Sequence, residues 1–272
     1  MSFKFLYRLS ALLILSFALF ASGCEDRSVS ETGKPPKSLL VFCGAGLRPP
    51  VAEIIEAFET ATGAQVEADY AGHQVLLSKI KLRGEGDIYV PGDKHYVDLA
   101  AKEGMILSQL PVCYFVPTIL VQKGNPKAIH SLQDLLAPGI RLGLGNPRAC
   151  AIGKKSKKLF EKNLIPWQEV ERNLCFLSAT VNELGMQIQA HSLDAVIVWD
   201  AIAKYYEPHG DEVQIPPQRN VTSTVDAGIL KFTRNKPLAE EFIKFMSSGS
   251  GREIFRKHGY RVDRPEGTSD TQ

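Results

Sequence analysis

The spacing of apolar residues changes period early in the chain. Residues 39–42 form an apolar run typical of a buried strand, and residues 49–58 then show helical spacing. Two prolines at the start of that helix suit its first turn, where an N–H has no intrahelical acceptor. The intervening turn, with Gly44 and Gly46, presents free N–H groups at the positive end of a helix dipole, so it suits an anion. The apolar face of the helix comprises Val51, Ile54, Ile55 and Phe58.

The same order of strand, turn and helix is repeated twice in the next 45 residues. Residues 65–70 alternate like a strand and lead through Gly72 and His73 into a second helix, and residues 87–90 form a third strand before Asp93, which can cap a third helix. Short strands alternating with helices predict a parallel sheet covered by helices on both faces. Ligands of such sheets bind beyond the carboxyl ends of the strands, where these turns lie. The apolar helix positions are Leu76, Leu77 and Ile80, then Tyr96, Val97 and Ala100.

A long apolar segment at residues 112–122, interrupted by Pro117, predicts a crossing into a second lobe because it exceeds one ordinary strand. The alternation of strands and helices then restarts. We expect strands at 142–144, 175–177, 195–198 and 227–232, and helices at 154–162, around Leu184 and Ile188, at 201–206, 238–247 and 250–257.

The pattern therefore predicts an α/β fold of two Rossmann-like lobes whose loops face each other across a ligand cleft. Residues 38–115 with 228–262 form the first lobe and residues 116–227 the second. Residues 263–272 form a polar tail.

The first 24 residues have the pattern of a targeting segment. A basic start precedes an apolar run at residues 9–20, followed by small residues and Cys24. This resembles the lipobox of bacterial lipoproteins, in which the cysteine is lipidated and becomes the mature N-terminus, although Ala21 replaces the usual leucine. Residues 25–37 would be a tether. We expect a protein anchored by lipid at Cys24, in the periplasm or on the extracellular face of the cell membrane. An uncleaved membrane anchor is the alternative.

The mature chain has no net charge to attract a polyanion. Without Lys4 and Arg8, the 32 basic residues become 30, equal to the 30 acidic ones. We therefore expect no nucleic-acid partner, and any bound anion must be held by local dipoles. Four lysines at 154, 155, 157 and 158 predict a solvated helix face that adds attraction near the cleft.

Six segments follow one another as in a known family: FCGAGLRPPVAEIIEAFETATGAQVEADYAGHQVLLSKI, GDIYVPGD, GNPRACAIGK, TVNEL, LDAVIVW and FMSSGSGREIFRKHGY. The chain resembles the periplasmic molybdate- and tungstate-binding proteins of ABC importers, from Leu39 to Tyr260. The resemblance implies the type II two-lobed fold of solute-binding proteins and delivery of an oxyanion to an ABC permease. We expect a monomer without a cofactor, and a sensory binding protein remains an alternative.

In that family neutral donors alone hold the oxyanion: backbone N–H groups at helix starts, hydroxyls and a tyrosine. The first two loops usually supply serine hydroxyls, which this chain lacks, and Trp199 stands at the tyrosine position, where it can donate but not accept. The resemblance assigns ligand binding to Ala45, Gly46, Gly72, His73, Ile152, Gly153, Val181, Asn182 and Trp199.

Two residues leave the choice of ligand open. His73 would donate to an oxyanion, and would add charge if protonated, or it points to solvent at a helix start. Asp200 in the cleft would repel a fully ionised oxyanion and favour a protonated, phosphate-like anion or a cation. Alternatively, Asp200 is the N-cap of the helix at 201–206.

The cysteines allow two further hypotheses. Cys43 and Cys150 lie in or beside opposing cleft loops, so with His73 and Asp200 they would form a soft transition-metal site or, on closure, a disulfide; otherwise they are small packing residues. Cys113 and Cys175 lie in apolar runs where buried thiols are common. A thiol enzyme is disfavoured because the chain has no nucleophile elbow, Walker loop or HExxH motif. We predict a binding protein, not an enzyme.

Overall fold

The computed structural model describes residues 37–267 and 269–270. The predicted signal peptide with Cys24, and all of the tether except Lys37, lie outside the described residues. Within the described part of the chain, no helix is both long and apolar enough to cross a bilayer.

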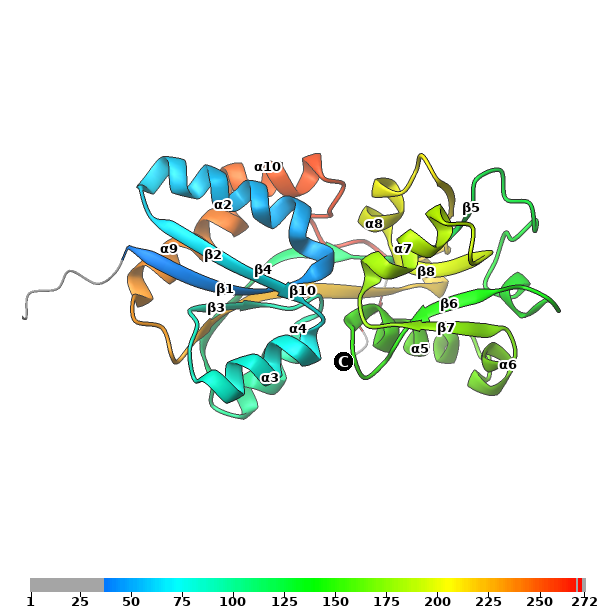
Figure 1. The fold of residues 1–272 in the computed structure, drawn as a ribbon, viewed down its shortest axis with the longest axis horizontal. Coiled ribbons are helices and arrows are strands. Elements are labelled where there is room, and N and C mark those ends of the chain that lie inside the picture. Colours follow the sequence, from blue (N-terminus) through cyan, green and yellow to red (C-terminus); the bar gives the residue numbers. More distant parts are fainter. Residues whose placement is uncertain (1–36, 268, 271–272) are drawn as a thin grey trace, which may run out of the picture. The chain divides into compact units, whose positions relative to one another are not determined.

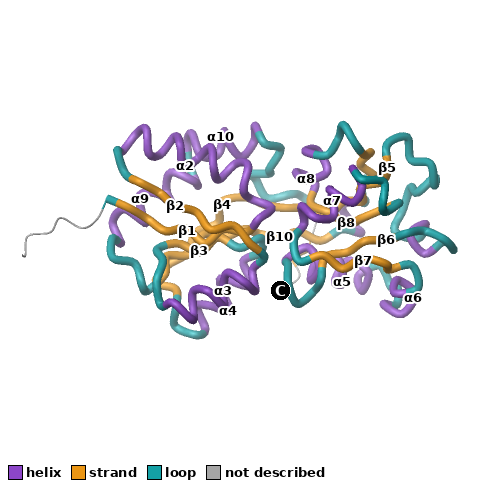
Figure 2. Tube along the Cα trace, viewed as in Figure 1, coloured by secondary structure: helices purple, strands orange, loops and turns teal. Residues whose placement is uncertain are grey.

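The described chain contains two sheets, each flanked by helices (Figures 1 and 2). The first sheet has the order β11-β10-β3-β1-β2, with β4 paired to β10. It comprises β1 (Ser38–Gly44), β2 (Gln65–Ala71), β3 (Ile88–Val90), β4 (Ile106–Phe115), β10 (Val221–Leu230) and β11 (Ser269–Asp270).

The second sheet has the order β7-β6-β8-β5-β9. It comprises β5 (Pro117–Gln122), β6 (Leu142–Gly145), β7 (Leu174–Ser178), β8 (Ala195–Trp199) and β9 (Gly210–Val213). The predicted crossing at residues 112–122 is confirmed, because β4 ends at Phe115 in one sheet and β5 begins at Pro117 in the other.

Helices cover both faces of each sheet, as Figure 1 shows: α2 and α10 lie opposite α3 and α4, and α7 and α8 lie opposite α5 and α6. The helices of the first lobe are α2 (Arg48–Thr62), α3 (His73–Arg83), α4 (Lys94–Lys102), α9 (Lys236–Ser247) and α10 (Gly249–Lys257). Those of the second are α5 (Ala151–Lys162), α6 (Trp167–Glu171), α7 (Val181–Gln189) and α8 (Asp200–Tyr205). Three 3₁₀ turns are η1 (Ala45–Leu47), η2 (Asp134–Leu136) and η3 (Pro217–Arg219).

The helix faces predicted from spacing are confirmed. All four predicted apolar residues of α2 are buried, and Phe58 packs edge-on against Phe242, with ring centroids 5.0 Å apart. Asp93 caps α4 by accepting a hydrogen bond from the His95 N–H at 2.8 Å. Gly63 ends α2 with a φ of +68°, which glycine adopts without steric cost.

The prediction of parallel sheets was wrong in part, because both sheets are mixed. Strand β10 runs antiparallel to β3 and β4, and β5 runs antiparallel to β8 and β9. A strand that returns from the other lobe does not pass through a helical crossover, so it need not be parallel.

The returning strand also starts earlier than predicted. Its first residues look loop-like in sequence, yet Thr222 and Ser223 are fully buried in β10. The burial of Ser223 is compatible with a strand because its Oγ donates to the Asp93 carboxylate at 2.6 Å. The predicted lobe boundary at 227/228 therefore falls inside β10, and the exact division of the lobes stays a prediction.

Candidate functional site

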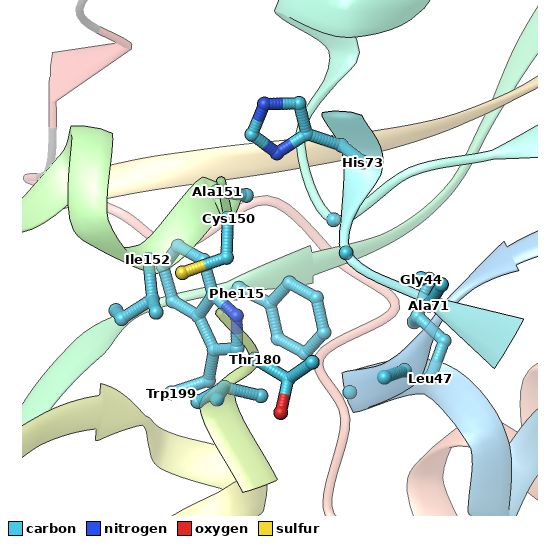
Figure 3. Close-up of a pocket in the computed structure, with 15 residues that line it drawn as sticks. Gly44, Leu47, Ala71, His73, Phe115, Cys150, Ala151, Ile152, Thr180 and Trp199 are labelled. Carbon is cyan, nitrogen blue, oxygen red and sulfur yellow. The ribbon is translucent and has the colours of Figure 1, made fainter. Parts of the chain in front are cut away.

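A small pocket lies where loops of both lobes meet (Figure 3). Its interior volume is about 30 Å³, room for roughly two water molecules. The lining residues are Gly44, Ala45, Gly46, Leu47, Ala71, Gly72, His73, Gly92 and Phe115 from the first lobe, and Cys150, Ala151, Ile152, Thr180, Val181 and Trp199 from the second.

Helix N-termini from both lobes open at this pocket. Helix α3 starts after Gly72 and α5 after Cys150, and neither has a side chain hydrogen-bonded to its first-turn N–H groups. First-turn N–H groups have no intrahelical acceptor either, so they are available to a ligand. Helix α7 also starts here but is capped by Thr180, which accepts from the Glu183 N–H at 3.4 Å. The pocket thus combines the positive ends of helix dipoles with a lining that has no cationic side chain.

Two stacked aromatic rings form one wall. The rings of Phe115 and Trp199 lie 4.8 Å apart between centroids and within 7° of parallel. No hydrogen bond recorded among the described residues involves the Trp199 indole nitrogen. This wall therefore offers an apolar surface with one N–H donor.

His73 is buried, so the hypothesis that it points to solvent was wrong. Its ring is stacked on Tyr96 with centroids 3.4 Å apart, and the residue is 4% exposed. Burial and the nearby Lys154 lower the pKa of His73 to about 4, against an opposing effect of Asp93. The imidazole is therefore neutral near pH 7 and adds no charge. Its Nδ1 atom is buried without a hydrogen-bond partner in the described chain, and Figure 3 draws the ring at the edge of the pocket.

Seven of the ten predicted site residues line the pocket, and Gly153, Asn182 and Asp200 do not. Gly153 lies behind the lining, where a Cβ atom would come within 2.3 Å of the Gly145 carbonyl oxygen. The Asn182 side chain links the lobes instead, donating from Nδ2 to the Ala45 carbonyl at 3.1 Å.

Asp200 faces away from this pocket. Its Oδ2 atom accepts from Arg261 Nε at 2.6 Å, and its Oδ1 atom from the N–H groups of Ala201 and Val116 at 3.0 and 3.3 Å. Burial raises the pKa of its carboxyl group, although Arg261 opposes that effect. Asp200 is the first residue of α8 rather than its N-cap, and it lines separate hollows beside Arg261. The predicted repulsion of an anion by Asp200 inside the pocket was therefore wrong.

The residues of the alternative metal site are not brought together in the structure. Among the described residues no group of three or more His, Cys, Asp or Glu side chains is placed to hold a metal ion. Cys43 is fully buried, which raises its pKa, and burial raises the pKa of Cys150 to about 11. Both remain protonated thiols at neutral pH, which are poor ligands.

Cys43, Cys113, Cys150 and Cys175 are all free in the structure, so the alternative of a disulfide between Cys43 and Cys150 is not formed here. Cys175 is exposed, contrary to the prediction, because its side chain lies on the same face of β7 as Leu177, which is also exposed.

Sequence reasoning missed several lining residues. Thr180 had a usable signal, since Thr-Val-Asn-Glu matches a capping box at the start of a helix. Phe115 had none, because it lies within a continuous apolar run. The lining residues outside the predictions are Leu47, Ala71, Gly92, Phe115, Ala151 and Thr180; Gly44 was predicted only as part of the first glycine turn, and Cys150 only as a metal ligand, a disulfide partner or a packing residue.

Comparison with known proteins gives one family for nearly the whole described chain. The model of the bacterial extracellular solute-binding proteins matches residues 39–261. A putative binding protein of Haemophilus influenzae is 28% identical over 225 residues, covering 82% of this chain and 90% of its own. A molybdate-binding protein of Mycobacterium bovis is 23% identical over 254 residues, covering 92% and 95%. The structure of a sulfate-binding protein of Mycobacterium tuberculosis has a TM-score of 0.73 at 19% identity, covering 83% and 87%.

Proposed function

Because this chain belongs to the bacterial extracellular solute-binding proteins, we propose that it captures molybdate or tungstate between its lobes and delivers the ion to the permease of an ABC importer. The family consists of solute-binding transport proteins, so the chain is a binding protein and not an enzyme.

The main observation in support of the proposal is that α3 and α5, one from each lobe, begin without a capping side chain. A fully ionised oxyanion only accepts hydrogen bonds, and N–H groups at helix starts only donate them. The pocket lining contains no carboxylate to repel a dianion. We assign the donors to backbone N–H groups of Ala45, Gly46, Gly72, His73, Ile152 and Val181, with the Trp199 indole; Gly153 lies behind the lining, and Asn182 holds the first loop in place.

The small volume also supports an inorganic ion. Room for roughly two water molecules excludes bulky organic solutes from this conformation of the protein. Sulfate is the competing ligand, because it offers the same tetrahedral array of acceptors and a sulfate-binding protein shares the fold. The bacterial lipid anchor at Cys24 belongs to the same proposal and keeps the protein beside its permease.

Calorimetric titration of the protein beginning at Glu25 tests the ligand. We expect molybdate or tungstate to bind at least tenfold more tightly than sulfate or phosphate, and to raise the melting temperature because a ligand of the folded state stabilises it. Ferric and zinc ions should not bind. Trp199→Phe keeps the stacking on Phe115 but removes one donor, so its affinity for the oxyanion should fall about tenfold or more.

Tight binding of sulfate or phosphate alone would preserve the oxyanion site but exclude molybdate and tungstate. Stabilisation by a metal ion, with no response to any oxyanion, would overturn the proposal.

A further inference from the structure

A buried ion pair joins the two lobes next to the pocket. Lys155 Nζ on α5 lies 2.9 Å from Asp93 Oδ2 at the start of α4, and each side chain is 7% exposed. The predicted solvated lysine face was therefore wrong for Lys155, while Lys157 on the same helix is exposed.

Both partners are held by further hydrogen bonds. Asp93 accepts from Ser223 Oγ at 2.6 Å and from the His95 N–H at 2.8 Å, and Lys155 also donates to the Thr222 carbonyl at 2.8 Å. The carboxylate is therefore fixed in place, and Lys155 is its cationic partner.

The pair lies directly behind pocket residues. Asp93 follows Gly92, and Lys155 lies one helical turn after Ala151; Gly92 and Ala151 both line the pocket. A Cβ atom on Gly92 would come within 3.3 Å of the Ala151 Cβ, so the lobes touch at this point. Lys154 lowers the pKa of His73, another lining residue, and Asp93 raises it, so both charges lie close to the edge of the pocket.

A carboxylate close to the pocket would disfavour an anionic ligand. A dianion held by neutral donors has no cation in the pocket lining to offset a nearby carboxylate, and burial weakens screening by solvent. We propose that Lys155 makes the pocket compatible with an anion by neutralising Asp93, so that this pair determines selectivity for charge without touching the ligand. The inference rests on the proposed function.

The inference predicts opposite effects for the substitutions Lys155→Met and Asp93→Asn, which allows a direct test. We measure the Kd for molybdate by calorimetry in the wild-type protein, Lys155→Met, Asp93→Asn and the double variant. Lys155→Met should raise Kd at least tenfold, which is about 1.4 kcal/mol. Asp93→Asn, which keeps a capping side chain on α4, should leave Kd unchanged or lower it.

The double variant should return to within about threefold of the wild-type Kd, because it lacks both charges. Lys157→Met is the matched control: it removes one lysine from α5 and changes the net charge equally, but at an exposed position, so Kd should stay within about twofold. Circular dichroism verifies that each variant folds. If Lys155→Met does not fold, the Kd values of Asp93→Asn and of the double variant still test the inference, because neither variant leaves a buried unpaired carboxylate.

If Asp93→Asn and the double variant both weaken binding as Lys155→Met does, the pair acts as a mechanical link between the lobes and the inference is wrong. Absence of molybdate binding by the wild-type protein would instead refute molybdate as the ligand, and the inference would fall with it.

Discussion

His73 shows how a single side chain can be polar, buried and neutral at the start of a helix. Its ring is stacked on Tyr96, also buried, and this contact leaves little water to solvate an imidazolium. The cation Lys154 further disfavours protonation. The residue therefore supplies a neutral ring at the edge of the pocket and not the charged donor considered from the sequence.

This environment predicts a pH-dependent stability. The folded-state pKa of about 4 lies below the ordinary value of 6.5, so the unfolded chain binds more protons between these values and stability falls as pH falls. Between pH 7 and pH 5 the wild-type protein should lose about 2 kcal/mol more than His73→Gln, which does not titrate. Urea unfolding of both proteins at each pH measures the difference. Equal losses would show that His73 is not the group responsible.

At the scale of elements, the helix starts at the pocket differ in how their N–H groups are satisfied. Helices α3 and α5 have no capping side chain, whereas α7 has Thr180 at its N-cap. The carboxylate of Glu183 completes the α7 cap by accepting from Ser178 Oγ at 2.6 Å and from the Ala179 N–H at 3.1 Å. Helix α7 is thus fixed by its own sequence, while α3 and α5 leave donors unused.

Removal of this carboxylate should destabilise the second lobe. Glu183→Ala deletes an acceptor for two donors, and we expect it to lower the free energy of unfolding by about 1–2 kcal/mol. Chemical denaturation measures the loss. Glu183→Gln is the matched control, because its amide oxygen still accepts hydrogen bonds. It should lower the free energy of unfolding by less than half as much as Glu183→Ala does. Equal destabilisation by both variants would point to charge and not to capping.

At the scale of the whole described fold, the lobes approach each other through glycine. A Cβ atom on Gly72 of the first lobe would lie 2.8 and 2.9 Å from the carbonyl oxygens of Ala179 and Ala149 in the second. These are backbone atoms, which cannot move aside as a flexible side chain can. The close approach of the lobes at the pocket therefore requires glycine at position 72.

Gly72→Ala should separate the lobes without damaging either one. The φ of Gly72 is −66°, which alanine adopts readily, so the stability of the ligand-free protein should change by less than about 1 kcal/mol. Oxyanion affinity should fall at least tenfold, and small-angle scattering should show a larger radius of gyration than for the wild-type protein.

Gly46→Ala provides a graded comparison. Its Cβ atom would meet the Val181 Cγ1 atom at 2.7 Å, a side-chain atom that can shift, so the loss of affinity should be smaller than for Gly72→Ala. If Gly72→Ala bound the oxyanion as tightly as the wild-type protein does, the present close spacing of the two lobes would not be needed for binding.

The sequence by itself determined the alternation of strands and helices, the buried faces of α2, α3 and α4, the Asp93 cap and the glycine turns at the pocket. Each of these depends on residues within about one helical turn or a few strand positions, so periodicity and turn chemistry report them directly. The family resemblance added the two-lobed arrangement, and seven of its transferred site residues line the pocket.

Only the tertiary structure determined where the polar residues lie and which partners they have. Asp200 turns away from the pocket because Arg261, 61 residues later, pairs with it, and Lys155 is buried because Asp93 in the other lobe pairs with it. Burial of a charged group is stable only when a partner compensates its loss of hydration. Those partners are distant in sequence, and local patterns do not record them.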